Sequence, residues 1–185
     1  PKLLLPLGPR RVIEHVLDAL THSRVDRTIV VLPPDADELV SVVSSFKVEL
    51  VQLTVRTPDM RSSVLCGLER AEQLSDAEKL AGFLVALADQ PTLSARIVDQ
   101  LIDRSRGSTK SVFIPTCGGK RGHPVLFSWS LATRVRKIPP DRGLDWLISQ
   151  LGEEVEEFPV DDSGLLADLD TPEDYERLQR GDWKI

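Results

Sequence analysis

The acidic side chains best placed for chemistry lie in two segments that are far apart in the chain. Asp89 directly follows the apolar run at residues 83–88, and Asp168 and Asp170 are separated by a single residue. In an extended backbone, Asp168 and Asp170 project to the same side. Mg²⁺ prefers oxygen ligands and usually takes one or two protein carboxylates, leaving water and phosphate oxygens to complete its shell. Asp89 with Asp168 or Asp170 is therefore a candidate magnesium site for a bound nucleotide.

Ordinary turn and helix chemistry explains part of the same pattern. Asp89 taken alone is more simply a turn residue ahead of a helix. Thr171 or Asp170 can cap the helix that begins next, and the acidic residues of its first turn favour the helix dipole. These roles account for residues 170–174 but give no reason for Asp168. The order of the carboxylates within the fold therefore counts for more than any one of them.

The hydrophobic pattern predicts the frame that would position these carboxylates. Short apolar runs indicate strands at residues 28–32, 48–55, 83–87, 112–115, 125–127 and 155–160. Helical spacing indicates helices at about 10–20, 36–44, 62–71, 94–105, 141–151 and 172–180, the third of them capped by Ser62 or Ser63. This alternation predicts a doubly wound, three-layer αβα fold with a mostly parallel, Rossmann-like sheet. Ligands of such sheets bind beyond the carboxyl ends of the strands, where Asp89 is expected.

Length and charge narrow the function classes. The 185 residues, of which 41% are hydrophobic, are expected to form one domain over 1–185. A net charge of -6 means that the chain lacks the excess of positive charge that attracts nucleic acids or anionic lipids, so we expect neither nucleic acid nor a membrane surface as a partner. No stretch is typical of a signal peptide, which makes the cytoplasm the expected compartment. Cys66 and Cys117 have no metal-ligand spacing and are expected to be free thiols.

Five segments in order resemble the nucleotidyltransferase family that activates molybdopterin, in particular the molybdenum cofactor cytidylyltransferases. They are residues 1–8 (PKLLLPLG), 12–17 (VIEHVL), 88–91 (ADQP), 122–127 (GHPVLF) and 168–175 (DLDTPEDY). The first resembles the end of the family's signature loop and the third its metal-binding strand end. The resemblance runs from the first residue to nearly the last. Each motif alone is modest, but five in the family's order are specific.

The resemblance implies a role for each carboxylate and for one lysine. Lys2 would lie beside the triphosphate and neutralise charge on the leaving pyrophosphate. Asp89, Asp168 and Asp170 would hold Mg²⁺ against the α-phosphate. A terminal phosphate of molybdopterin would attack that phosphorus, with no covalent protein intermediate.

Two further segments are given binding roles by the resemblance. Ser62 and Ser63 lie in the segment that is similar to the part of the family that meets the nucleotide, although helix capping is the simpler role for one of them. Gly122, His123 and Pro124 would line the pterin side of the crevice. His123 would either bind the pterin phosphate or only hold its loop.

One departure from the family's pattern concerns the loop that binds the triphosphate. The family's glycine-rich loop and first strand are expected immediately before Pro1, and the sequence from Pro1 onward does not contain them. Backbone donors of such a loop supply the main hold on the phosphates. Residues 1–185 by themselves are therefore expected to bind nucleotide weakly and to transfer little.

Three functions remain open at this point. The favoured one is Mg²⁺-dependent transfer of CMP from CTP to molybdopterin, because the Gly122-His123-Pro124 segment and the all-Asp pair Asp168 and Asp170 lean toward the cytidine branch. The second is guanylyl transfer from GTP within the same family. The third is a non-catalytic module that binds the molybdenum cofactor and presents it to a molybdenum enzyme.

Overall fold

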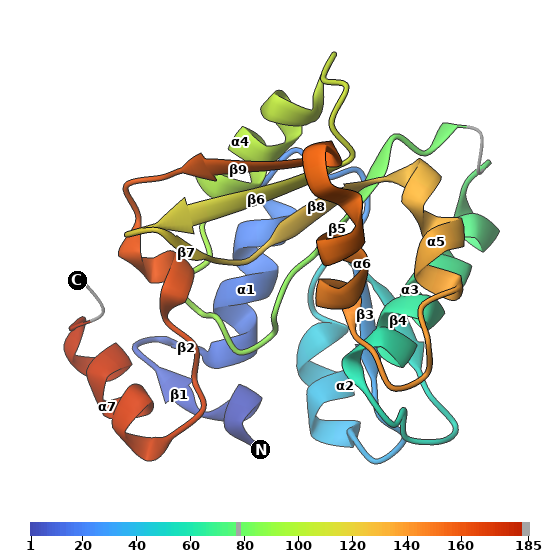
Figure 1. The fold of residues 1–185 in the computed structure, drawn as a ribbon. Helices are drawn as coiled ribbons and strands as arrows, with labels where there is room; N and C mark the ends of the chain where they lie inside the picture. The colour runs from blue at the N-terminus through green and yellow to red at the C-terminus, as the bar shows by residue number, and fades with distance from the viewer. Residues whose placement is uncertain (77–78, 183–185) are drawn as a thin grey trace.

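The computed structural model describes residues 1–76 and 79–182 and has the expected α/β architecture (Figure 1). The strands are β1 (Pro6–Leu7), β2 (Arg10–Arg11), β3 (Ile29–Leu32), β4 (Glu49–Gln52), β5 (Gly82–Val85), β6 (Val112–Cys117), β7 (Lys120–Arg121), β8 (Val125–Ser128) and β9 (Val155–Pro159). The helices are α1 (Val12–Thr21), α2 (Asp37–Val43), α3 (Met60–Leu74), α4 (Ala95–Ser105), α5 (Ala132–Arg136), α6 (Leu144–Leu151) and α7 (Pro172–Arg180).

The larger sheet is mixed, with most of its strands running in one direction. β8 pairs antiparallel with both β5 and β6, so β5 and β6 share a direction, and β9 pairs parallel with β6. The short β7 pairs antiparallel with β6 and closes a hairpin. β3 and β4 form a separate parallel pair. The doubly wound α/β class is confirmed, and β8 is the main strand that runs against the common direction.

The two faces of this sheet are covered by different helices. Along β6, Val112 and Ile114 pack in the cluster that contains residues of α5 and α6, whereas Phe113 packs with Ile97 and Leu101 of α4. Successive side chains of a strand point to opposite faces, so β6 is buried on both sides. The expected three layers follow from this alternation, as Figure 1 shows.

The start of α3 differs from the sequence-based expectation. Asp59, rather than Ser62 or Ser63, is the N-cap, and its Oδ1 accepts a hydrogen bond from the Ser62 backbone N–H at 2.7 Å. An aspartate is as good a cap as a serine, and it lies one residue before the first helical residue, Met60. The two serines therefore belong to the first turn of α3, and the predicted cap was wrong.

Gly67 inside α3 offers a direct test of local stability. Glycine in a helix interior costs up to about 1 kcal/mol relative to alanine. A Cβ at this position would meet Val31 Cγ2 at 3.8 Å, which is ordinary van der Waals contact. We expect Gly67→Ala to raise the free energy of unfolding by about 0.5–1 kcal/mol in urea denaturation. A loss of stability would show that α3 cannot accept even a methyl group against β3.

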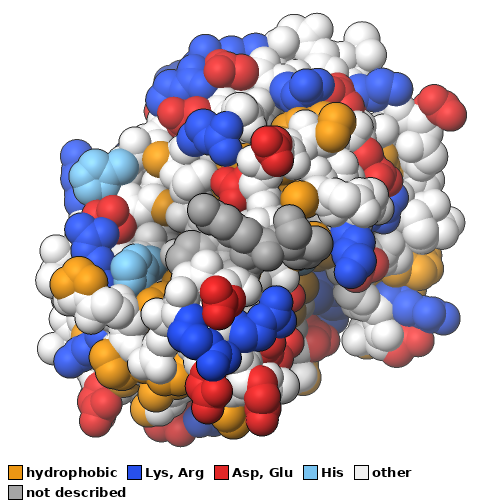
Figure 2. Space-filling model, turned by 90° about the vertical axis from the view of Figure 1, so that its left-hand side faces the viewer, with side chains coloured by type: hydrophobic (Ala, Val, Ile, Leu, Met, Phe, Trp, Pro, Cys, Tyr) orange, Lys and Arg blue, Asp and Glu red, His pale blue; other side chains and the backbone are white. Residues whose placement is uncertain are grey.

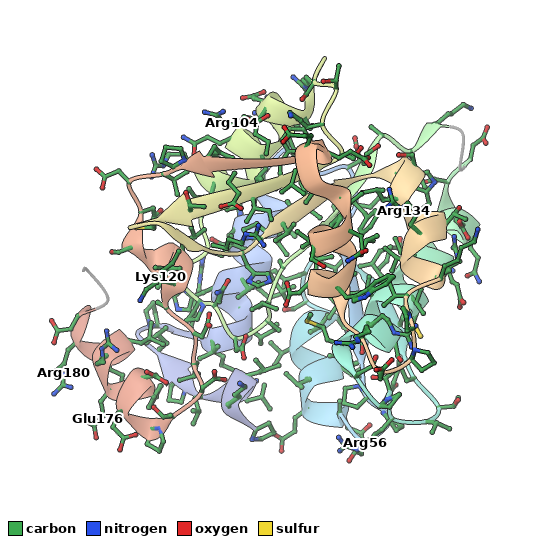
Figure 3. All side chains as sticks on the ribbon, viewed as in Figure 1. Arg56, Arg104, Lys120, Arg134, Glu176 and Arg180 are labelled. Atoms are coloured by element: carbon green, nitrogen blue, oxygen red, sulfur yellow. The ribbon has the colours of Figure 1, made fainter. Side chains whose placement is uncertain are left out.

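Several ion pairs lie on the surface of these layers. Arg104 of α4 donates to Glu156 at 2.9 Å, and Arg134 of α5 donates to Glu154 at 3.3 Å (Figure 3). On the face that Figure 2 turns toward the viewer, basic and acidic side chains are interspersed. Exposed pairs of this kind contribute about 0–1 kcal/mol each, so the core rather than the surface holds the layers together.

Two smaller expectations concern the cysteines and the helices. Cys66 and Cys117 are half-buried free thiols, as the sequence predicts. Among the residues that the structure describes, no helix combines the length and the apolar character needed to cross a membrane.

Candidate functional site

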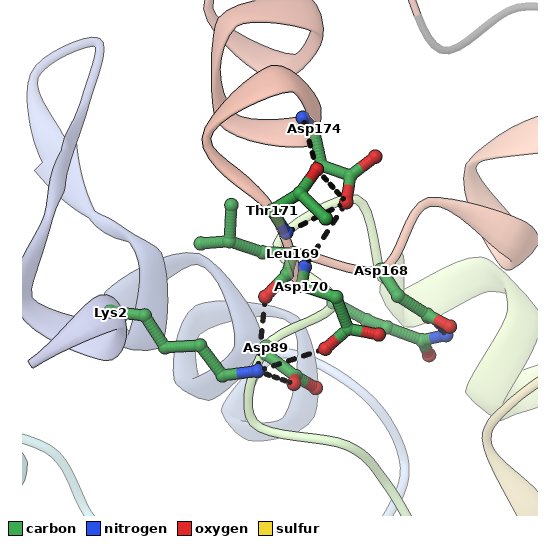
Figure 4. Close-up of polar contacts among 8 residues, drawn as sticks. Lys2, Asp89, Asp168, Leu169, Asp170, Thr171 and Asp174 are labelled. Atoms are coloured by element: carbon green, nitrogen blue, oxygen red, sulfur yellow. Dashed lines mark hydrogen bonds and ion pairs between the residues drawn. The ribbon is translucent and has the colours of Figure 1, made fainter.

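The structure brings Lys2 between two of the predicted acidic side chains (Figure 4). Lys2 Nζ donates to Asp89 Oδ2 at 2.6 Å and to Asp170 Oδ1 at 3.1 Å. The same ammonium donates to the backbone carbonyl of Leu169 at 3.0 Å. Three segments that are distant in sequence therefore meet at one atom.

Backbone contacts fix the two acidic segments relative to each other. Asp89 lies in the turn after β5, and its carbonyl oxygen accepts a hydrogen bond from the Leu169 N–H at 3.1 Å. The Leu169 side chain is buried in a cluster with Val12 of α1 and Leu178 of α7. Burial of Leu169 and the main-chain hydrogen bond hold Asp170 beside Asp89 without help from either carboxylate.

Asp168 points away from Lys2, toward Gln90 (Figure 4). Gln90 Nε2 donates to Asp168 Oδ1, and Gln90 is buried. Residues 167–170 belong to no strand, and Asp168 and Asp170 contact different partners, so the projection to one side expected for an extended backbone does not hold. A magnesium-binding role for Asp168 stays a prediction.

Gln90 is a site residue that the sequence interpretation missed. Its amide also donates to the carbonyl of Leu165 at 3.4 Å, and the neighbouring Thr92 Oγ1 donates to the carbonyl of Gly164 at 2.6 Å. These contacts dock the 3₁₀ turn Ser163–Leu166 onto the turn after β5. The available signal was a polar amide directly after Asp89, because a buried amide needs partners.

The helix-capping interpretation of the last acidic segment is confirmed. Thr171 Oγ1 accepts a hydrogen bond from the Asp174 N–H at 3.2 Å, and Asp174 Oδ2 accepts one from the Thr171 N–H at 2.9 Å. Pro172 takes the first helical position of α7. The hydrogen bonds from Thr171 lower the pKa of the Asp174 carboxyl. Because Thr171 is the cap, the side chain of Asp170 is left to contact Lys2.

The Gly122-His123-Pro124 segment lies against the same turn. A Cβ on Gly122 would lie 2.1 Å from Leu165 Cγ, so only glycine allows this approach. Burial lowers the pKa of the His123 imidazole, and the carboxylates of Asp168, Asp145 and Asp89 offset part of that shift. His123 is therefore mainly neutral at pH 7. Asp145, in the first turn of α6, is a neighbour that sequence reasoning missed.

Ser62 and Ser63 have local partners at the start of α3. The Ser62 N–H is held by Asp59, and Ser63 Oγ lies 2.8 Å from Thr57 Oγ1. These contacts are those of a helix start and its preceding loop. A nucleotide contact from either hydroxyl stays a prediction.

The charged groups at this site are the Lys2 ammonium and the carboxylates of Asp89 and Asp170. The hydrogen bond to Asp89 is the main cause that raises the pKa of Lys2, and Asp170 adds to it. Lys2 is thus fully charged at neutral pH. Across residues 1–76 and 79–182, no group of three or more His, Cys, Asp or Glu side chains is arranged to hold a metal ion. Two carboxylates do suffice for Mg²⁺, which fills the rest of its shell with water and phosphate.

A groove of about 430 Å³ lies elsewhere, between α4 and β9. Its lining includes Arg96, Gln100, Arg104, Phe158, Val160 and Asp161. Arg104 stacks 4.4 Å above the ring of Phe158 while it pairs with Glu156, and Arg96 lies 3.5 Å from Asp162. Its basic groups are thus engaged with local partners, and the convergence at Lys2 is the better candidate site.

Comparisons with known proteins identify the family of this chain. Residues 1–155 match the family described as the MobA-like NTP transferase domain. Purine catabolism protein PucB from Bacillus subtilis (strain 168) is 32% identical over 120 residues, which are 64% of this chain. That match spans 55% of PucB, so the chain covers little more than half of that relative.

Two solved structures are similar over nearly the whole chain. Rv0371c from Mycobacterium tuberculosis H37Rv, in complex with manganese, gives a TM-score of 0.81 at 23% identity, covering 97% of this chain and 92% of that one. Its homolog from Mycobacterium sp. strain JC1 gives 0.79 at 28% identity, covering 98% and 87%. These structures share the fold, and the family match, which includes Lys2 and Asp89, establishes that the chain belongs to the MobA-like NTP transferase domain family of nucleotidyltransferases.

Proposed function

We propose that this protein transfers CMP from CTP to molybdopterin with release of pyrophosphate, and that Mg²⁺ is its metal. The observation that carries the proposal is the convergence of Lys2 Nζ, Asp89 and Asp170 at the turn after β5. A triphosphate with a divalent cation needs such a mixed set, because carboxylates bind the cation and an ammonium binds phosphate oxygens.

The residues present fit a magnesium ion. Asp89 Oδ2 and Asp170 Oδ1 both lie within 3.1 Å of one ammonium, so the two oxygens converge closely enough to serve a single cation. We assign Asp89 and Asp170 as the carboxylates that would hold it. When bound, Mg²⁺ would neutralise charge on the α-phosphate and make its phosphorus a better electrophile.

The protein's own part in the reaction is positioning and charge neutralisation. A terminal phosphate oxygen of molybdopterin forms a bond to the α-phosphorus, and the bond from that phosphorus to the bridging oxygen breaks, which releases pyrophosphate. Lys2 would neutralise the charge that builds up on this leaving group. No side chain needs to form a covalent intermediate.

The acceptor side is assigned to the segment around His123. A neutral imidazole can donate one hydrogen bond to a phosphate without adding charge. The burial of Gly122 against Leu165 fixes this loop next to the carboxylates. The similarity of this segment to molybdenum cofactor cytidylyltransferases, together with membership of the MobA-like family, supports molybdopterin as the acceptor.

The nucleotide preference is tested by transfer from α-labelled CTP or GTP to molybdopterin, using the full-length protein with Mg²⁺. We expect CMP transfer to exceed GMP transfer by at least about tenfold, which is the discrimination that a few base contacts provide.

The other outcomes separate the competing functions. Preferential transfer from GTP would make the protein a guanylyltransferase and overturn the cytidine assignment. Calorimetric binding of molybdopterin without transfer from either nucleotide would instead indicate the non-catalytic carrier.

A further inference from the structure

Lys2 occupies the position that a cation bridging the two carboxylates would need. Its Nζ has three oxygen partners, at 2.6 Å from Asp89, 3.1 Å from Asp170 and 3.0 Å from the carbonyl of Leu169. Figure 4 shows the ammonium in contact with both acidic side chains. A cage of oxygens around a single positive charge is also what a divalent cation requires.

The ammonium and a divalent cation cannot share this position. Two positive charges a few Å apart repel strongly, even in the partly exposed surroundings of a protein surface. Nζ occupies one oxygen of each carboxylate, Asp89 Oδ2 and Asp170 Oδ1. A cation that bridges these two oxygens must therefore displace Lys2.

The Lys2 side chain can move away from Asp89 and Asp170 when a more strongly charged partner binds. Its side chain is 45% exposed, so the ammonium can swing outward without disturbing the core. A nucleoside triphosphate brings several negative charges to the same place, and these can take over the ammonium. The carboxylates are then released to the cation that accompanies the triphosphate.

We infer that Lys2 competes with the divalent cation for Asp89 and Asp170, so that the cation binds tightly only together with the nucleoside triphosphate. The inference rests on the proposed function, in which these two carboxylates hold the metal. It assigns Lys2 a second role besides contact with the phosphates. Lys2 keeps free divalent cations out of the site until the nucleotide arrives.

The test uses Mn²⁺ as the probe, because its binding can be followed by electron paramagnetic resonance without any reaction. In the full-length protein without nucleotide, Lys2→Met should bind Mn²⁺ at least about tenfold more tightly than the unsubstituted protein. Methionine keeps much of the length of the side chain and removes the charge. Lys2→Arg keeps the charge and should bind Mn²⁺ as weakly as the unsubstituted protein.

Two controls make the result specific. Lys47→Met removes one charge from an exposed lysine in the turn before β4 and should leave Mn²⁺ affinity unchanged. Adding Asp89→Asn to Lys2→Met should remove the gain. Thermal unfolding with EDTA and with Mn²⁺ reports on the fold, and Mn²⁺ should raise the melting temperature of Lys2→Met more than that of the unsubstituted protein.

The remaining outcomes distinguish two failures. Equal Mn²⁺ affinity in Lys2→Met and the unsubstituted protein, lost from both with Asp89→Asn, would overturn the competition and leave the metal site standing. Absence of Mn²⁺ binding from every variant, with or without a triphosphate, would refute both the competition and the metal assignment of the proposed function.

Discussion

Replacing Asp89 by Asn should lower the rate of nucleotidyl transfer by at least about 10²-fold. The amide oxygen of asparagine carries no charge, so the cation loses one of its two carboxylates and the shortest contact of Lys2 loses its ionic character. The fold should survive, because the carbonyl of residue 89 still accepts the hydrogen bond from Leu169. The Lys2–Asp89 pair is partly exposed, and such pairs contribute about 0–1 kcal/mol to stability.

The measurement pairs transfer rates with urea unfolding for three variants. Asp26→Asn makes the same chemical change at an exposed carboxylate after α1 and should leave the rate unchanged. Asp168→Asn should cost less activity than Asp89→Asn, because an asparagine oxygen can still accept the hydrogen bond from Gln90. Full activity in Asp89→Asn would rule out its role in holding the metal, and a larger loss in Asp168→Asn would reverse the assignment.

Gly122→Ala should destabilise the protein by about 3 kcal/mol, because overpacking a closed contact forces neighbouring atoms to move. The new Cβ would lie 2.1 Å from Leu165 Cγ, 2.5 Å from Leu165 Cδ2 and 2.9 Å from the Leu165 carbonyl oxygen. The carbonyl belongs to the 3₁₀ turn and has no rotamer with which to avoid the methyl group. Because the displaced turn carries the contacts to Gln90, we also expect transfer to slow.

Gly67→Ala is the matched control, since the same substitution there should stabilise the protein. A double-mutant cycle locates the clash. In a Leu165→Ala background, Gly122→Ala should cost at least about 1 kcal/mol less than in the unsubstituted protein, because two of its three close contacts are gone. An unchanged cost would trace the loss to the carbonyl of residue 165 instead of to the Leu165 side chain.

Much of the fold follows from the apolar pattern of the sequence. The run before Asp89 contains β5, and the buried, alternating residues of β6 mark a strand covered on both faces. The position of Asp89 in the turn after β5 follows from this, because a residue that directly follows a strand lies at the carboxyl end of that strand. The direction of β8 could not be predicted in the same way, because a buried strand has the same apolar pattern whether it pairs parallel or antiparallel with its neighbours.

The selection of carboxylates could not be made from the sequence. Asp168 contacts Gln90 and Asp170 contacts Lys2, in a segment that forms no strand, and the spacing of the two residues does not predict this difference. Recruitment of Gln90 and Asp145 depends on how the 3₁₀ turn and α6 dock, which is a tertiary property. Lys2 was expected beside the phosphates, but its contacts with both carboxylates required coordinates.

The main-chain hydrogen bond from Leu169 to Asp89 also bears on the order of folding. It joins a turn in the middle of the chain to the segment that leads into the final helix, and contacts of such long sequence separation are slow to form. The parallel pairing of β6 with β9 joins segments that are closer in the sequence, so it is expected to form earlier. The pair proposed to bind the cation would then be among the last features to assemble, and metal affinity would report whether the C-terminal segment has docked.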